Sequence, residues 1–112
     1  MLVEAIDAKY INMKNAQVSV EKYTDGTLGL IAQDEDEEGY PNEEHFSVNL
    51  AAYGLTPDDG CVFIKDYSEH EGLAKALEGL GLGTIARTFQ FGPFSSNAHE
   101  FKLTDALIGE AR

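Results

Sequence analysis

The chain has 112 residues, of which 43% are hydrophobic and 10% aromatic, and its formal net charge at pH 7 is −12. This composition is typical of a folded protein rather than a disordered acidic tail, and the length fits a single domain over residues 1–112. The negative charge argues against direct binding to nucleic acid or to a membrane, and favours basic protein surfaces or cations. Because we find neither a signal-peptide pattern nor a long apolar run, we expect a cytoplasmic protein.

The acidic residues are concentrated in the middle of the chain. Between Tyr23 and Ile64 there are ten acidic residues and neither Lys nor Arg, while acidic and basic residues nearly balance on both sides. Salt-adapted proteins spread acidic residues over the whole surface, so this concentration favours a local binding function over general solubility.

The apolar pattern predicts an α+β fold, in which an antiparallel β-sheet of five to seven strands carries one α-helix packed on a face. Residues 17–23 and 28–33 alternate apolar and polar side chains, as half-buried strands do, whereas residues 1–7 are a weaker strand candidate. Asp25-Gly26, between the first two, predicts a tight hairpin in which both residues take positive φ.

The acidic segment follows this hairpin. Residues 34–44, which Gly39 and Pro41 interrupt, are expected to form an acidic connection. A third strand is expected over residues 45–50, and a loop over residues 51–60.

The second half of the chain is expected to contain the helix. Ser68 and Glu71 have the spacing of a capping box, in which two side chains bond to the first free amides of a helix. An apolar stripe at helical spacing follows, made of Leu73, Leu77 and Leu80. We therefore expect a helix over about residues 69–80. Further strands are expected over residues 61–65, 84–91 and 99–103, and a helical turn or tail over residues 105–112.

The acidic segment is the strongest candidate for a partner-binding site. In a strand, alternate side chains share a face at about 6.6–6.8 Å, so Asp34, Asp36 and Glu38 would form a row of negative charges. Such a row fits a groove of Lys and Arg that normally follows a phosphate backbone, and Tyr40 would supply an apolar anchor. The predicted partner-binding residues are Asp34, Glu35, Asp36, Glu37, Glu38, Tyr40, Glu43 and Glu44. The alternative is a solvated, partly disordered loop without a partner, and Tyr40 and Pro41 within the acidic residues favour the binding site over it.

The same segment begins like a calcium-binding EF-hand loop. Asp34, Asp36, Glu38 and Gly39 fill its first four key positions, but His45 stands where a bidentate Glu is required. We therefore expect neither a metal nor a cofactor.

The chain offers little for catalysis. His45, His70 and His99 do not have the spacing of metal ligands, and His70 is expected in the exposed first turn of the helix. Cys61 lies in an apolar strand, where burial raises a thiol pKa rather than lowering it. Because the nucleophile and nucleotide-binding motifs are also absent, we expect that the protein is not an enzyme.

Between about Val18 and Leu103, several blocks of the chain resemble a known family. The most specific block is Phe63–Gly72. The others are Val20–Leu28, Phe46–Leu50, Leu77–Leu82, Arg87-Thr88 and Glu100–Leu103. Together they resemble the family known as domain of unknown function 4313, from mobile elements and gut bacteria. The chain departs from that family in a longer acidic insertion, in Ile85-Ala86-Arg87 and in Phe91–Phe94. The resemblance implies a phage or mobile-element context and supplies no catalytic residues.

We therefore expect a non-enzymatic anti-defence inhibitor of the anti-CRISPR or antirestriction type, acting in the cytoplasm of a bacterial host. It would dock its acidic face on the basic, nucleic-acid-binding surface of a host protein. The alternative is a structural or accessory protein that homodimerises through its sheet or through an aromatic hairpin containing Phe89, Phe91 and Phe94.

Overall fold

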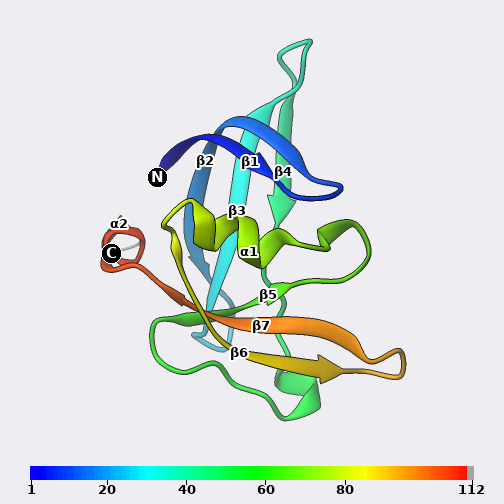
Figure 1. Ribbon diagram of the computed structural model, residues 1–112. Coiled ribbons are helices and arrows are strands. Elements are labelled where there is room, and N and C mark those ends of the chain that lie inside the picture. The colour runs from blue at the N-terminus through cyan, green and yellow to red at the C-terminus, as the bar shows by residue number, and fades with distance from the viewer. Residues whose placement is uncertain (111–112) are drawn as a thin grey trace.

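The computed structural model describes residues 1–110, and within them the chain forms seven strands in two antiparallel sheets, together with short helices (Figure 1). The strands are β1 Leu2–Asp7, β2 Asn12–Lys22, β3 Leu28–Glu35, β4 Pro41–His45, β5 Cys61–Lys65, β6 Gly83–Phe91 and β7 Ser96–Leu103. The α-helices are α1 Leu73–Gly79 and α2 Asp105–Glu110, and two 3₁₀ turns are η1 Ala51–Tyr53 and η2 Ser68–His70. The predicted α+β class is confirmed, but the predicted single sheet is divided into two.

The first sheet has the strand order β1-β2-β3-β4. Its central pair, β2 and β3, places Val18 opposite Ala32 and Val20 opposite Leu30, which puts the apolar side chains of both strands on one face. The predicted strand pair and its inward face are therefore confirmed. The strand predicted over residues 1–7 is present as β1.

The turn between β2 and β3 differs from the predicted one. Only Gly26 takes a positive φ, of 86°, and Asp25 instead accepts hydrogen bonds from the amide and hydroxyl of Thr27. Tyr23 and Thr27 close the loop through a backbone hydrogen bond of 2.8 Å. This is a turn with a glycine bulge, which needs positive φ at one residue rather than two.

The acidic segment is not an irregular connection. β3 continues through Glu35 and β4 begins at Pro41, so residues 34–44 form most of a second β-hairpin. The third strand predicted over residues 45–50 is wrong in position. β4 ends at His45, and the chain then crosses to the second sheet, where Ser47 makes a single bridge with Ile64.

The second sheet has the order β5-β7-β6 and confirms the strands predicted over residues 61–65, 84–91 and 99–103. The helix begins later than predicted, because Ser68 has φ 54° and Gly72 has φ 81°, which separates η2 from α1. Ser68 makes no capping hydrogen bond, and the amide of Gly72 donates instead to Asp66 at 2.6 Å. The predicted capping box is therefore wrong.

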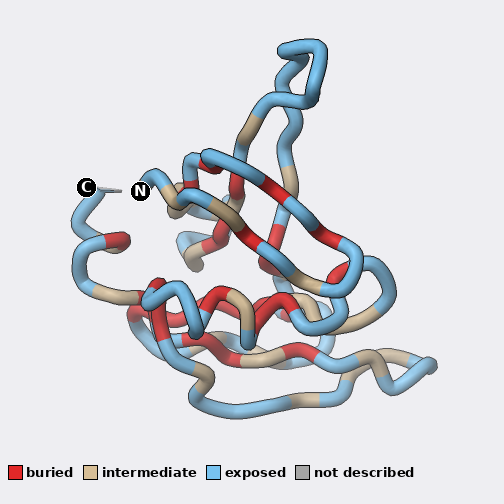
Figure 2. The backbone as a smooth tube through the Cα atoms, turned by 45° about the horizontal axis from the view of Figure 1, so that its top comes forward, coloured by how far each residue is buried: buried red, intermediate tan, exposed pale blue. Residues whose placement is uncertain are grey.

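One apolar core joins the two sheets. Leu73, Ala74 and Leu77 of α1 are buried together with residues of both sheets and with Leu107 of α2, so the helix fills the space between the sheets (Figures 1 and 2). A smaller cluster around Leu50 and Phe63 covers the other face of the second sheet. Of the predicted tail, residues 105–110 form α2, and residues 111–112 lie outside the described residues. No helix within residues 1–110 is long and apolar enough to cross a membrane.

Candidate partner-binding arm

Residues 34–44, here called the acidic arm, form the outer end of the β3–β4 hairpin. The arm projects from the body of the molecule, and nine of its eleven residues are exposed (Figures 1 and 2). Strand β2 pairs with β3 only as far as Gln17 opposite Gln33, so beyond that point the arm consists of β3 and β4 alone. All eight predicted partner-binding residues lie on this one element.

The tip of the arm is a defined turn held by Asp36. Its Oδ1 accepts hydrogen bonds from the amides of Glu38 at 3.0 Å and Tyr40 at 2.9 Å. Gly39 takes φ 84°, and the amide of Asp36 donates to the carbonyl of Tyr40. This is the same glycine-bulge arrangement as at Tyr23–Thr27, so the tip presents its side chains in a fixed geometry.

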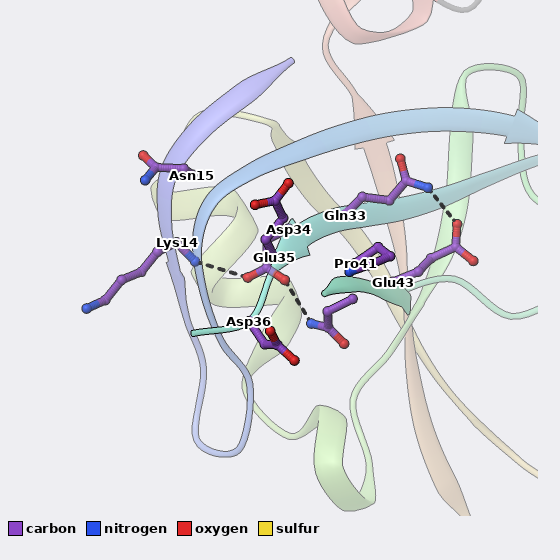
Figure 3. A pocket seen from close by; sticks show the side chains of 9 residues that line it. Lys14, Asn15, Gln33, Asp34, Glu35, Asp36, Pro41 and Glu43 are labelled. Carbon is purple, nitrogen blue, oxygen red and sulfur yellow. Dashed lines mark hydrogen bonds between the residues drawn. The ribbon is translucent and has the colours of Figure 1, made fainter. Parts of the chain in front are cut away.

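The base of the arm is held by Asp34, which lies beside a surface hollow of about 940 Å³ (Figure 3). Its carboxylate accepts hydrogen bonds from the amide of Lys14 at 3.3 Å and from the side-chain amide of Asn42 at 2.9 Å. Asp34 is half-buried and ties β4 and β2 to the strand between them. Its role in the structure is therefore to position the arm.

Three acidic side chains of the arm remain free of internal partners. Glu35, Glu37 and Glu38 are exposed, and their carboxylates make no hydrogen bond or ion pair with the rest of residues 1–110. Tyr40, two residues beyond Glu38, is 67% exposed. The tip therefore combines three available negative charges with an exposed aromatic ring.

The last two acids lie on opposite faces of β4. Glu43 accepts a hydrogen bond from Gln33 at 2.9 Å and lies 3.3 Å from the ring of His45. Glu44 faces the body, where its carboxylate lies 3.9 Å from Nε2 of His70. His70 was expected to be exposed but is buried, because it belongs to η2, where its ring lies against Glu44 of β4, and not to the first turn of α1.

The groups considered for metal binding or catalysis lie elsewhere. No cluster of three or more His, Cys, Asp or Glu side chains within residues 1–110 has the geometry of a metal site. Cys61 is buried as predicted, and burial is the main cause that raises the pKa of its thiol. A thiol with a raised pKa is a poor nucleophile at neutral pH.

Two polar networks on the second sheet have no clear sequence pattern. His99 joins Asp66 through Nε2 and Thr88 through Nδ1, the latter at 2.8 Å. The fully buried Glu100 binds Arg87 and the amide of Asp58. Both networks connect side chains that are distant in sequence, which is why sequence reasoning missed them.

The aromatic hairpin predicted as an alternative interface is largely packed into the molecule. Phe91 lies edge-on to both Tyr53 and Tyr67, and Phe89 lies edge-on to Phe63. Phe94, at the tip of the β6–β7 hairpin, is 90% exposed. Only one of the three phenylalanines is thus available for a partner.

Comparison with family models, with curated proteins and with solved structures finds no match for the chain. The resemblance to the domain of unknown function 4313 family therefore stays a prediction.

Proposed function

We propose that the protein is a non-enzymatic inhibitor from a phage or mobile element, of the anti-CRISPR or antirestriction type, which acts in the cytoplasm of its bacterial host. It docks its acidic arm on the basic, nucleic-acid-binding surface of a defence protein. The observation that carries this proposal is the arm itself, a projecting hairpin with three free carboxylates and no Lys or Arg.

The shape of the arm suits a groove that normally holds nucleic acid. A two-stranded ribbon is narrow, because its strands lie about 4.8 Å apart, and its free carboxylates take the place of phosphates opposite Lys and Arg. The internal hydrogen bonds of Asp34 and Asp36 fix the ribbon before binding, which reduces the conformational entropy that is lost on docking. Tyr40 lies among these charges as the aromatic contact on which binding energy is commonly concentrated.

The proposal is tested with an arm variant that carries Glu35→Gln, Glu37→Gln and Glu38→Gln. These changes remove three charges and no internal contact, so the arm should keep its structure. The parent and the variant are immobilised, proteins retained from a bacterial lysate are identified by mass spectrometry, and the affinity of the purified candidate is measured. We expect the arm variant to bind about ten- to a hundred-fold more weakly than the parent, and we expect duplex DNA to compete with the parent.

The matched control carries Glu4→Gln, Asp7→Asn and Asp59→Asn, which change the net charge equally at exposed positions outside the arm. It should bind like the parent. If the control and the arm variant weaken equally, the partner responds to net charge alone and the arm is not the site.

A homodimeric accessory protein is the second candidate, because Phe94 exposes 90% of its surface at a hairpin tip. Light scattering after size exclusion separates the two candidates. A dimer that persists at high salt and is lost in Phe94→Ser would favour this second function.

A further inference from the structure

We propose that His70 and Glu44 form a proton-controlled ion pair at the base of the acidic arm, which regulates how strongly the arm binds a basic partner. The ion pair is a property of the isolated protein, whereas its effect on binding rests on the proposed function.

The first observation is an unpartnered buried nitrogen. Nε2 of His70 is the one buried side-chain nitrogen or oxygen within residues 1–110 that lacks a hydrogen-bond partner. Only 8% of the His70 side chain is exposed. Buried polar atoms are almost always paired, so an exception requires a physical explanation.

The second observation is the direction in which this nitrogen points. Nε2 lies 3.9 Å from Oε2 of Glu44, which belongs to the arm. At this separation neutral His70 makes no hydrogen bond to the carboxylate. In protonated His70 both ring nitrogens carry a proton, so Nε2 becomes a charged donor that faces the carboxylate, and the contact becomes an ion pair.

The charges around His70 explain why the ring is neutral near pH 7. Burial is the main cause that lowers its pKa below the ordinary value of 6.5, and Lys65 on β5 acts in the same direction. Glu44 on β4, Glu69 on η2 and the hydrogen bond to His45 oppose them. The ring therefore takes up a proton as the pH falls below 6.5, and the protonated ring then pairs with the carboxylate of Glu44.

Protonation changes what the arm offers a partner. In the neutral state the carboxylate of Glu44 makes no hydrogen bond to another described residue and is one-third exposed, so it can contact a cationic side chain. In the protonated state it is paired with His70, and the base of the arm gains one positive charge. By thermodynamic linkage, a basic partner that binds Glu44 must also disfavour protonation of His70.

The ion pair is tested by an NMR titration of the histidine rings in the isolated protein. Glu44→Gln removes a group that raises the pKa of His70, so this pKa should fall further in the variant. The matched control is Glu43→Gln, the neighbouring acid on the opposite face of β4, which should leave the titration of His70 unchanged. An unchanged titration of His70 in Glu44→Gln would overturn the ion pair.

The effect on binding is tested with a decalysine peptide as the basic probe. Between about pH 7.5 and about pH 5.5, the affinity of decalysine for the parent should fall about three-fold more than its affinity for the His70→Gln variant does. If the affinity for decalysine depends on pH equally in the parent and in His70→Gln, the proposed regulation is overturned, even where the NMR titration supports the ion pair. If decalysine binds the arm variant and the parent equally at pH 7.5, the proposed function fails instead, and the NMR result still decides the ion pair.

Discussion

Glu100 on β7 is a charged side chain with no exposed surface, and two groups from distant parts of the chain satisfy its carboxylate. Arg87 on β6 donates through Nε at 2.6 Å, and the amide of Asp58 donates at 2.7 Å. These contacts hold the loop before β5 against the sheet. Because a buried carboxylate is tolerated only when it is paired, we infer that the three groups act as one unit.

We predict that Glu100→Ala lowers the free energy of unfolding by about 2–4 kcal/mol, since it leaves the Asp58 amide unpaired and removes buried volume. Urea unfolding followed by circular dichroism measures the loss. The control is Glu71→Ala, an exposed glutamate on the surface ion pair with Lys9, which should change the value by less than about 1 kcal/mol. Equal losses in the two variants would show that the buried network contributes nothing.

His70 contributes a pH dependence of folding. Because its pKa is lowered in the folded protein, the unfolded chain takes up a proton at a higher pH than the native state does. This contribution is absent well above pH 6.5, where His70 is neutral in both the folded and the unfolded state. It lowers stability as the pH falls through 6.5 toward the pKa of His70 in the folded state. His70→Gln should remove this part of the acid sensitivity, which thermal unfolding at a series of pH values measures.

Among the structural elements, the tip of the acidic arm depends on Gly39. Its φ of 84° is unfavourable for a residue with a side chain, although a Cβ atom there would meet nothing within 4 Å. We therefore predict that Gly39→Ala costs about 1–2 kcal/mol locally, through backbone strain alone. Hydrogen exchange of the Asp36 and Tyr40 amides should become faster while that of the core strands stays unchanged.

Gly83 provides the contrast on β6. A Cβ atom at this position would lie 2.2 Å from the backbone carbonyl oxygen of Lys102 and 2.4 Å from the ring of Phe101. Gly83→Ala should therefore destabilise the whole fold, and exchange should become faster throughout the core. If Gly39→Ala has the same global effect, the arm is coupled to the core and is not an independent element.

The sequence predicts most of the elements that bury apolar side chains. The pairs Val18–Ala32 and Val20–Leu30 are recognisable because alternation marks a half-buried strand. The arm has no such mark, since it buries almost nothing and seven of its eleven residues are acidic. The sequence feature that indicates this second hairpin is Gly39, which has the same position in its turn as Gly26 has in the turn of the first hairpin.

The start of the helix and the state of His70 could not be predicted for a related reason. Ser68 and Glu71 match the local capping pattern, but the bond that is made runs from Gly72 to Asp66. The shift moves His70 from an exposed helical turn to a buried position against β4. A local pattern of residues cannot report which distant strand will pack on them.

At the scale of the whole molecule, the net charge of −12 opposes folding, because the folded state brings like charges closer together. The arm, which carries Glu35, Glu37 and Glu38, moderates this repulsion because its hairpin projects away from the body (Figures 1 and 2). The same separation leaves these three charges available to a partner. Salt should therefore act in opposite directions on folding and on docking.

We predict that raising NaCl from about 0.02 M to about 0.5 M increases the free energy of unfolding by about 1 kcal/mol, because screening weakens the repulsion. Over the same range the affinity for decalysine should fall by about ten-fold or more, because screening also weakens the attraction. Urea unfolding and a binding titration of the same sample measure the two effects. Because the fold gains stability while binding is lost, unfolding cannot explain the lost affinity. If stability falls together with binding, the acidic residues stabilise the native structure through attractive contacts, and the arm is not a region of unrelieved negative charge.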